Sequence, residues 1–361
     1  MKIRINKILV SGAAIALLTS VSSNIYAGNE DRVGQSGASQ LQINPWARSS
    51  GFANANTASV IGLESVNLNV AGLAFTNKTE AMFAHTRYLS GSEISINSFG
   101  LSQRIGETGV LGINVMSMNF GDIDITTVDL PEGGSGTYSP QFLNIGLSYA
   151  KEFSNSIYAG ATVKVISEKM TNASASGVAF DAGIRYVTGK YDNVKFGIAL
   201  KNVGPQMQFD GDGLSTKVTY NEEEFTLEQR TEPYELPSSL SIGVAYDYYI
   251  GVDESKKDDK LKAMHRITGA GNFLANSFGK DQVMIGAEYA FKEMFMVRAG
   301  LVYEDGIFDS NERTTVYTGP TAGLTVAVPI NDKGSSIDID YSYRDTNPFN
   351  GTHTVGIRIN L

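Results

Sequence analysis

The chain has 361 residues and a net charge of −9, with 29 Lys and Arg against 38 Asp and Glu. This acidic balance argues against a nucleic-acid partner, which would call for a basic stripe. The sequence contains no cysteine, which excludes disulfides, thiol chemistry and a lipid-modified N-terminal cysteine.

Residues 1–27 have the pattern of a secretory signal peptide. Three basic residues lie within residues 2–7, an apolar run follows over 8–18, and Ala27 is a plausible cleavage point. The run is too short to span a bilayer, which needs roughly 20 residues. We therefore expect the chain to be exported and the signal to be removed.

Residues 28–78 show no alternation and are rich in Gly, Ala, Asn and Ser. Short stretches such as 53–61 could form small helices. This segment precedes the first predicted strand, so it could fold inward as a plug or hatch of a barrel, or it could lie beneath the barrel.

From residue 79 onward, apolar and polar residues alternate in segments of about 10–15 residues. The 38 glycines, 17 Tyr and 17 Phe also favour many strands joined by turns. The alternation predicts about fourteen strands, an even number as bacterial outer-membrane barrels require. These strands are predicted at 80–90, 93–104, 108–119, 138–152, 156–171, 176–188, 193–203, 236–250, 261–273, 281–292, 294–305, 314–328, 335–345 and 351–361.

The last strand ends the sequence with Val355, Ile357 and Ile359 on one face and Thr354 and Arg358 on the other. A closing strand of an outer-membrane barrel has this pattern, and it resembles the C-terminal signal that the barrel-assembly machinery reads. The alternative is an edge strand of a soluble sandwich. The signal peptide and the mature length favour the barrel, so we predict an all-β fold: a transmembrane antiparallel β-barrel of about 14 strands over 79–361, with an N-terminal plug segment.

Charged residues in the middle of strands are typical of a barrel with a polar lumen. Two interpretations remain open for them, a selective pore lining or a ladder of paired charges that braces the barrel. The residues of this predicted lumen charge ladder are Lys164, Asp181, Arg185, Glu288, Arg298, Asp338, Asp340, Arg344 and Arg358.

Connection lengths support the strand count. Short turns are predicted on the periplasmic side, and the long loops 120–137, 204–235 and 306–313 on the outer side. The charged connection 251–260 does not fit, because it is long and falls on the periplasmic side. It is either a solvated excursion or a sign that the strand count is wrong there.

The loop 204–235 mixes acidic residues with aromatic ones, and Val218 to Leu227 alternates in part, as in a hairpin above the membrane. Such a rim could dock a protein, or it could fold over the barrel mouth. The candidate partner-binding residues of this loop and of loop 120–137 with its following Tyr138 are Ile123, Ile125, Leu130, Tyr138, Tyr220, Phe225, Leu227 and Tyr234.

We expect no catalytic, cofactor or metal site. The three histidines, His85, His265 and His353, each fall in a predicted strand and in no nucleophile motif, although a spatial Ser-His-Asp arrangement leaves no sequence trace. Residues 210–213 (Asp-Gly-Asp-Gly) begin like a calcium loop, but Leu214 replaces the third acid, which favours a solvated turn.

An ordered set of short motifs resembles the PorV/PorQ family, outer-membrane proteins of the type IX secretion system of Bacteroidota, and the later motifs are nearer to PorV. Val70 stands where the family usually has proline. The motifs are Gly37-Ala38, Leu41-Gln42-Ile43, Ala47-Arg48, Gly51, Ala53-Asn54, Ala58-Ser59, Asn69-Val70-Ala71-Gly72-Leu73-Ala74, Lys201-Asn202-Val203-Gly204-Pro205, Leu236-Pro237-Ser238-Ser239-Leu240, Gly286-Ala287-Glu288-Tyr289, Arg298-Ala299-Gly300 and Asp340-Tyr341-Ser342-Tyr343.

The resemblance implies a FadL-like barrel with an N-terminal plug and no catalytic centre. It also implies outer-membrane lipid, the type IX translocon barrel, the C-terminal domains of secreted cargo and a surface attachment complex as partners. Two functions therefore remain open. One is a secretion adaptor that captures cargo at its outer rim, and the other is a FadL-like transporter of hydrophobic small molecules with 28–78 as a movable hatch.

Overall fold

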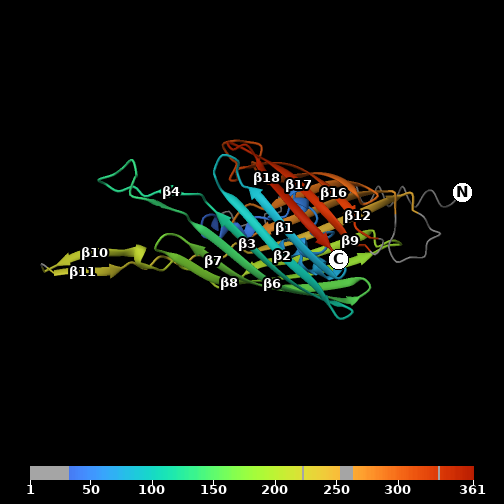
Figure 1. The fold of residues 1–361 in the computed structure, drawn as a ribbon, viewed down its shortest axis with the longest axis horizontal. Helices are drawn as coiled ribbons and strands as arrows, with labels where there is room; N and C mark the ends of the chain where they lie inside the picture. The colour runs from blue at the N-terminus through green and yellow to red at the C-terminus, as the bar shows by residue number, and fades with distance from the viewer. Residues whose placement is uncertain (1–31, 222, 253–262, 332–333) are drawn as a thin grey trace.

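A computed structural model describes residues 32–361, except for residue 222 and the segments 253–262 and 332–333. The predicted signal peptide, 1–27, lies outside the described residues. In the described part of the chain, fourteen antiparallel strands form one closed barrel (Figure 1). The predicted all-β antiparallel barrel of about 14 strands is confirmed.

Every barrel strand overlaps one predicted segment, and their ends agree to within four residues. The strands are β1 (Thr79–Arg87), β2 (Ser95–Ile105), β3 (Gly109–Asn119), β6 (Gln141–Ser154), β7 (Ile157–Lys169), β8 (Ser174–Thr188), β9 (Val194–Val203), β12 (Ser239–Ile250), β13 (His265–Asn276), β14 (Gln282–Phe291), β15 (Phe295–Tyr303), β16 (Tyr317–Pro329), β17 (Ser336–Thr346) and β18 (Thr352–Asn360).

The barrel closes where its first and last strands pair. β1 and β18 run antiparallel, with Glu80 opposite Asn360 and Phe83 opposite Ile357. Every barrel strand therefore has two neighbours, and the barrel sheet has no free edge. Closure of this kind satisfies the backbone hydrogen bonds of a sheet that is surrounded by lipid.

The polarity of the wall is the reverse of that in a soluble protein. On β18, Val355 and Ile357 are 49% and 45% exposed, whereas Thr354 and Arg358 are buried at 2% and 3%. The same alternation runs along β12, where Ile242 and Val244 point outward and Ser241 points inward. An apolar outer wall around a polar interior fits a barrel in lipid and argues against the soluble sandwich.

The connections divide the barrel into two ends. The long-loop rim carries residues 120–140, 204–238 and 304–316, and the short-turn rim carries tight turns such as 106–108 and 292–294. The connection between β12 and β13 is on the short-turn rim. Because these two strands pair along their full length, the predicted strand count is correct there. Residues 253–260 of the predicted charged connection lie outside the described residues.

Two small hairpins extend from the long-loop rim (Figure 1). β4 (Ile123–Asp124) pairs with β5 (Thr137–Tyr138) in the first long loop. β10 (Ser215–Tyr220) pairs with β11 (Glu223–Glu228) in the second, after the short helix η5 (Asp212–Leu214). The predicted hairpin within 218–227 is therefore present.

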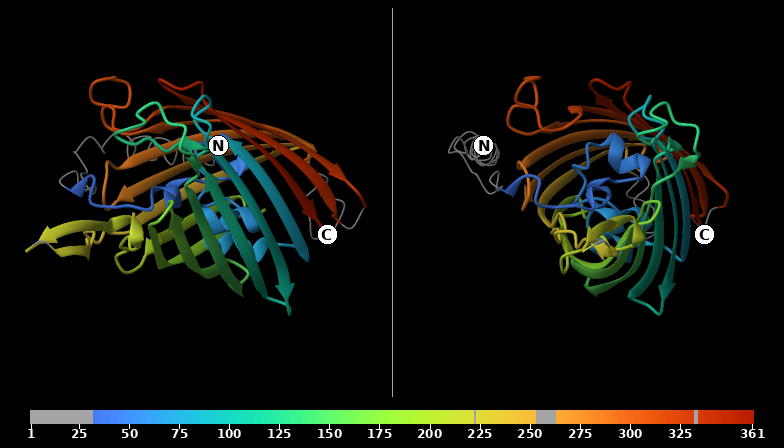
Figure 2. Two further views of the ribbon diagram at one scale, coloured as in Figure 1. Left: turned by 60° about the vertical axis from the view of Figure 1, so that its left-hand side comes forward. Right: turned by 90° about the vertical axis from the view of Figure 1, so that its left-hand side faces the viewer.

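The N-terminal segment, defined here as residues 32–78, passes through the barrel interior (Figure 2, right). At the long-loop rim, Gly37 donates its N–H to the Glu235 carbonyl oxygen (3.0 Å). At the short-turn rim, Arg104 donates to the carbonyl oxygens of Ala74 and Thr76 just before β1 begins. The helices of the N-terminal segment are η2 (Ser39–Gln42), α2 (Ala47–Gly51), η3 (Leu63–Asn67) and η4 (Val70–Phe75). No helix among the described residues is long and apolar enough to cross a membrane.

Glycines on the inner wall allow this segment to lie directly against the strands. A Cβ on Gly197 would lie 2.8 Å from the Thr57 carbonyl oxygen, and a Cβ on Gly300 would lie 2.6 Å from Ala53 Cβ. The abundance of glycine, attributed to turns from the sequence, therefore has a second cause. We call the inward-facing set the glycine girdle: Gly100, Gly112, Gly160, Gly183, Gly197, Gly243, Gly286, Gly300 and Gly323.

Candidate binding cavity and lumen charges

Seven of the nine residues of the predicted charge ladder form ion pairs inside the barrel. Lys164 lies 2.5 Å from Asp181, and Arg298 lies 2.7 Å from Glu288, in both cases across neighbouring strands. Their side chains are almost completely buried, so the attraction between the charges is weakly screened. The remaining ladder residues in ion pairs are Asp338, Asp340 and Arg358.

Each of these last three has a partner in the N-terminal segment, which the sequence does not indicate. Arg48 on α2 reaches Asp338 (3.3 Å) and Asp340 (3.4 Å) on β17. Glu64 on η3 accepts from Arg358 Nη2 on β18 (2.5 Å) and also from the Ser49 backbone N–H (2.5 Å). The interior charges therefore join the segment to the wall as well as strand to strand.

Two ladder residues lack a carboxylate within ion-pair distance among the described residues. Arg185 donates to the Val60 carbonyl oxygen (2.8 Å) and lies 4.2 Å above the ring of Phe75. Arg344 lies 3.8 Å from the ring centroid of Tyr317. Its Nε is buried and makes no hydrogen bond. Arg344 is thus the ladder residue whose charge is least compensated.

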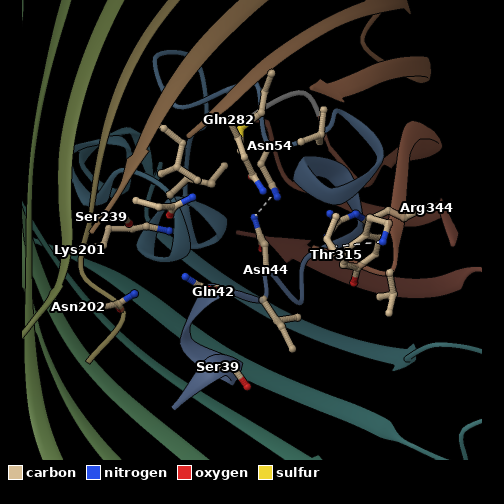
Figure 3. Close-up of a pocket in the computed structure, with 18 of the residues that line it drawn as sticks. Ser39, Gln42, Asn44, Asn54, Lys201, Asn202, Ser239, Gln282, Thr315 and Arg344 are labelled. Atoms are coloured by element: carbon tan, nitrogen blue, oxygen red, sulfur yellow. Dashed lines mark hydrogen bonds between the residues drawn. The ribbon is translucent and has the colours of Figure 1, made fainter. Parts of the chain in front are cut away.

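A cavity of about 440 Å³ occupies the interior at the long-loop rim. Its floor is the N-terminal segment, where Asn44 Nδ2 donates to Asn54 Oδ1 (2.9 Å) (Figure 3). Its wall comes from the rim-side ends of the strands, for example Met118 on β3 and Leu274 on β13. This volume falls within the range of roughly 300–1,000 Å³ that is typical of small-molecule sites.

The lining of this cavity combines apolar side chains, neutral polar groups and two cations. Phe120, Phe142 and Met284 are among the apolar residues. The cations are Lys201 on β9 and Arg344 on β17, and no Asp or Glu is among the lining residues. Lys201 Nζ donates to the Asn67 carbonyl oxygen (3.0 Å). The sequence gives Lys201 only as part of a family motif, so its place in a cavity is new.

A second cavity of about 370 Å³ lies on the short-turn side of the N-terminal segment. Its lining includes Lys195, Arg266 and Glu288, and here the charges are paired. Lys195 bonds Asp247, and Arg266 lies 2.9 Å from Glu288. The N-terminal segment thus separates a cationic cavity from a charge-balanced one.

The predicted partner-binding residues are spread over both hairpins. Ile123 pairs with Tyr138 across β4 and β5, and Ile125 and Leu130 lie in the turn between them. On the second hairpin, Tyr220, Phe225 and Leu227 share one face with Val218, and all four are exposed. The opposite face carries Lys217, Thr219, Glu224, Thr226 and Glu228.

Tyr234 differs from the other predicted contacts, because it is half-buried at the base of the loop. Its hydroxyl donates to Glu168 Oε2 (2.9 Å), whose other oxygen accepts from Gln40 Nε2 (2.9 Å). Burial, together with the nearby carboxylate, raises the pKa of Tyr234, which keeps this donor protonated. Tyr234 therefore connects the loop to the N-terminal segment and is not exposed for docking.

The three histidines lie on the outer wall and contact polar groups there. His85 Nδ1 lies 2.9 Å from Asn97 Oδ1, His265 Nδ1 lies 2.7 Å from the Tyr289 hydroxyl, and His353 Nδ1 lies 2.8 Å from the Tyr341 hydroxyl. Within the described residues, no cluster of three metal-binding side chains occurs.

Comparisons with known proteins identify the fold. No protein-family model matches the chain, and no curated protein matches it in sequence. Among solved structures, the CymD monoaromatic hydrocarbon channel matches with a TM-score of 0.53 and 12% identity, over 88% of this chain and 97% of the other. The Pseudomonas putida toluene transporter TodX matches with a TM-score of 0.52 and 12% identity, over 88% and 97% of the two chains. A Pseudomonas aeruginosa FadL homologue matches with a TM-score of 0.51 and 11% identity, over 87% and 98%. The chain therefore has the fold of FadL-like outer-membrane barrels.

Proposed function

We propose that this protein is an outer-membrane transporter of hydrophobic small molecules. The single observation that carries the proposal is the cavity at the long-loop rim, which is bounded by apolar and polar side chains and closed below by the N-terminal segment. The fold neighbours CymD and TodX, named as a hydrocarbon channel and a toluene transporter, support the same class.

In this proposal the N-terminal segment is a plug that moves during transport. The segment lies between the two cavities, so a solute can pass only when the segment shifts. Buried ion pairs at Arg48 and Glu64 hold it in place at rest. The glycine girdle provides a smooth inner wall along which the segment is seated.

Uptake into proteoliposomes tests the proposal. The purified protein is reconstituted into vesicles, and entry of a labelled fatty acid or of toluene is followed over time. We expect uptake faster than in protein-free vesicles. The same rate in both would contradict a transport function. A protein that stays soluble and compact without surfactant would contradict the outer-membrane location as well.

A second function is favoured by the β10–β11 hairpin. Its apolar face, formed by Val218, Tyr220, Phe225 and Leu227, is exposed beyond the barrel. Exposed aromatic and aliphatic side chains of this kind serve as anchors in protein interfaces. These side chains support a second proposed function, an adaptor of type IX secretion. Such an adaptor binds the translocon and the C-terminal domain of secreted cargo, and it passes the cargo to the surface attachment complex.

Pull-down of the tagged protein from detergent separates the two functions. Co-purification of translocon subunits or secreted cargo supports the adaptor. A barrel that purifies alone and takes up labelled fatty acid supports the transporter.

A further inference from the structure

The cavity at the long-loop rim carries positive charge that no carboxylate of its lining compensates. Its lining contains Lys201 and Arg344 and neither Asp nor Glu. The buried Glu304 is not among the lining residues, and its carboxylate accepts from the lining residue Gln282 (2.8 Å) and from Thr314 (3.1 Å). Within the described residues, neither cation has a carboxylate within 4 Å.

Other cations of the interior show what is missing here. Lys164, Arg298 and Arg358 each face a carboxylate at 2.5–2.7 Å. Lys201 and Arg344 are partly buried, so each has lost part of its hydration, and neither has such a partner to replace it. Lys201 donates only to a backbone carbonyl oxygen. Arg344 contacts only an aromatic ring, and its Nε makes no hydrogen bond. An anionic ligand would supply both missing partners.

The two cations lie on nearly opposite walls. In the order of the fourteen strands, β9 and β17 are six strands apart in one direction and eight in the other. With strands about 4.8 Å apart and tilted by roughly 40°, such a barrel is about 28 Å across. A lysine and an arginine side chain together span much less than this. Figure 3 accordingly shows Lys201 and Arg344 at opposite sides of the cavity, with Asn44 and Asn54 between them.

One anionic group therefore cannot bind both cations. Between the two strands, the wall presents Leu274 on β13, Met284 on β14 and Val302 on β15 to the cavity. Together with neutral polar residues of the same arc, such as Ser241, Asn272 and Gln282, these apolar side chains form an uncharged surface that links the two charged positions along the shorter arc. We propose, building on the transport function above, that the substrate is an elongated molecule with an apolar body and an anionic group at each end.

Calorimetric titration of the full protein in amphipol tests this proposal with three probes of equal chain length: dodecanedioate, dodecanoate and dodecanol. We expect dodecanedioate to bind about tenfold more tightly than dodecanoate, because each charged contact adds about one order of magnitude in affinity. Dodecanol should bind most weakly. Equal binding of dodecanol and dodecanedioate would overturn the proposal, and so would equal binding of the two acids.

Variants identify the groups responsible. Lys201→Gln and Arg344→Gln should each weaken dodecanedioate binding about tenfold and leave dodecanol binding unchanged, whereas Lys201→Arg and Arg344→Lys should retain most of the affinity. Lys151→Gln, which removes an exposed positive charge near the short-turn rim, is the matched control. A loss of affinity that is the same for all three probes would reflect misfolding and count against the assignment of these two residues.

Uptake measurements keep this inference apart from the proposed function. Transport of dodecanol at the rate of dodecanedioate would overturn the substrate class and leave transport intact. If none of the three probes enters proteoliposomes while dodecanedioate binds selectively, transport fails and the binding site stands.

Discussion

Arg358 on the closing strand β18 pairs with Glu64 on η3 of the N-terminal segment, although 294 positions separate them in the chain. Their atoms Nη2 and Oε2 are 2.5 Å apart, and both side chains are almost completely buried. Arg358 has its shorter carboxylate contact on the N-terminal segment and its longer one, Glu80 at 3.4 Å, on the neighbouring strand β1. Closure of the wall and seating of the N-terminal segment are therefore coupled energetically.

Glu64→Gln should destabilise the folded barrel. The substitution leaves Arg358 with Glu80 alone, at 3.4 Å from its Nε. We expect a loss of about 3 kcal/mol in the free energy of unfolding, at the lower end of the cost of breaking a buried ion pair. Urea unfolding in lipid vesicles measures it. Arg32→Gln, which removes the exposed pair with Glu235 at 4.0 Å, should cost less than about 1 kcal/mol. Equal effects of the two variants would show that the Glu64 pair has no special role.

Gly197→Ala should loosen the N-terminal segment. A Cβ at this position would lie 2.8 Å from the Thr57 carbonyl oxygen and 2.9 Å from Ala58 Cα, both on the backbone of the segment. Overpacking of this kind costs roughly 1–3 kcal/mol. Faster hydrogen exchange over residues 52–60 would report it.

Gly269→Ala is the matched control, since a Cβ there has no atom within 4 Å and Gly269 is exposed on the outer wall. It should leave hydrogen exchange unchanged. If residues 52–60 are as well protected from hydrogen exchange in Gly197→Ala as in the control, the N-terminal segment does not lie closely against the glycine girdle.

The strands could be predicted from the sequence because lipid and lumen impose opposite polarities on alternate residues. In β18, for example, Ile357 and Arg358 differ so clearly that one strand suffices to identify the pattern. The presence of charges inside the barrel follows from the same alternation. The two-fold period also fixes which face each charged residue occupies.

The contacts of the N-terminal segment could not be predicted, because its short helices have no hydrophobic period. Arg48 and Glu64 lie in a region without alternation, and their partners are nearly 300 residues away. The glycine girdle did leave a trace, the recurrence of glycine at inward positions such as Gly183 and Gly197. The cavity left none, since Lys201 and Arg344 face the same cavity from nearly opposite walls only through closure of the whole barrel.

A disulfide between Ala47→Cys and Gly356→Cys should lock the N-terminal segment to the wall. Ala47 Cβ lies 3.9 Å from the position of a Cβ on Gly356, close to the mean of about 3.8 Å in disulfides. Because the sequence contains no other cysteine, the bond formed is unambiguous. We expect the oxidised variant to insert normally and to lose uptake, and a reductant to restore it. Each single-cysteine variant should transport under both conditions. Undiminished uptake in the oxidised double variant would contradict a plug that moves at α2.

Replacing Ser215–Glu228 with a short turn should separate the two proposed functions. All described residues of this hairpin are exposed, whereas the base of the loop is held by the backbone pair of Met207 and Tyr234. Removal should therefore leave membrane insertion, stability and uptake unchanged. If the adaptor function is correct, recovery of secreted proteins in the pull-down should fall at least tenfold, because the hairpin carries the exposed apolar anchors.

A paired substitution on each face of the hairpin sharpens this test. Val218→Ser with Phe225→Ser removes two neighbours of the apolar face, and Thr219→Ser with Thr226→Ser changes two residues of the polar face. Since both variants keep the backbone pairing, only a docking role of the apolar side chains predicts a difference between them. The first should reproduce the loss seen without the hairpin, and the second should capture partners as the unmodified protein does. Equal capture of partners by the two paired variants would assign the binding to the backbone edge of the hairpin. Full capture by the protein that lacks the hairpin would exclude the hairpin as the docking element.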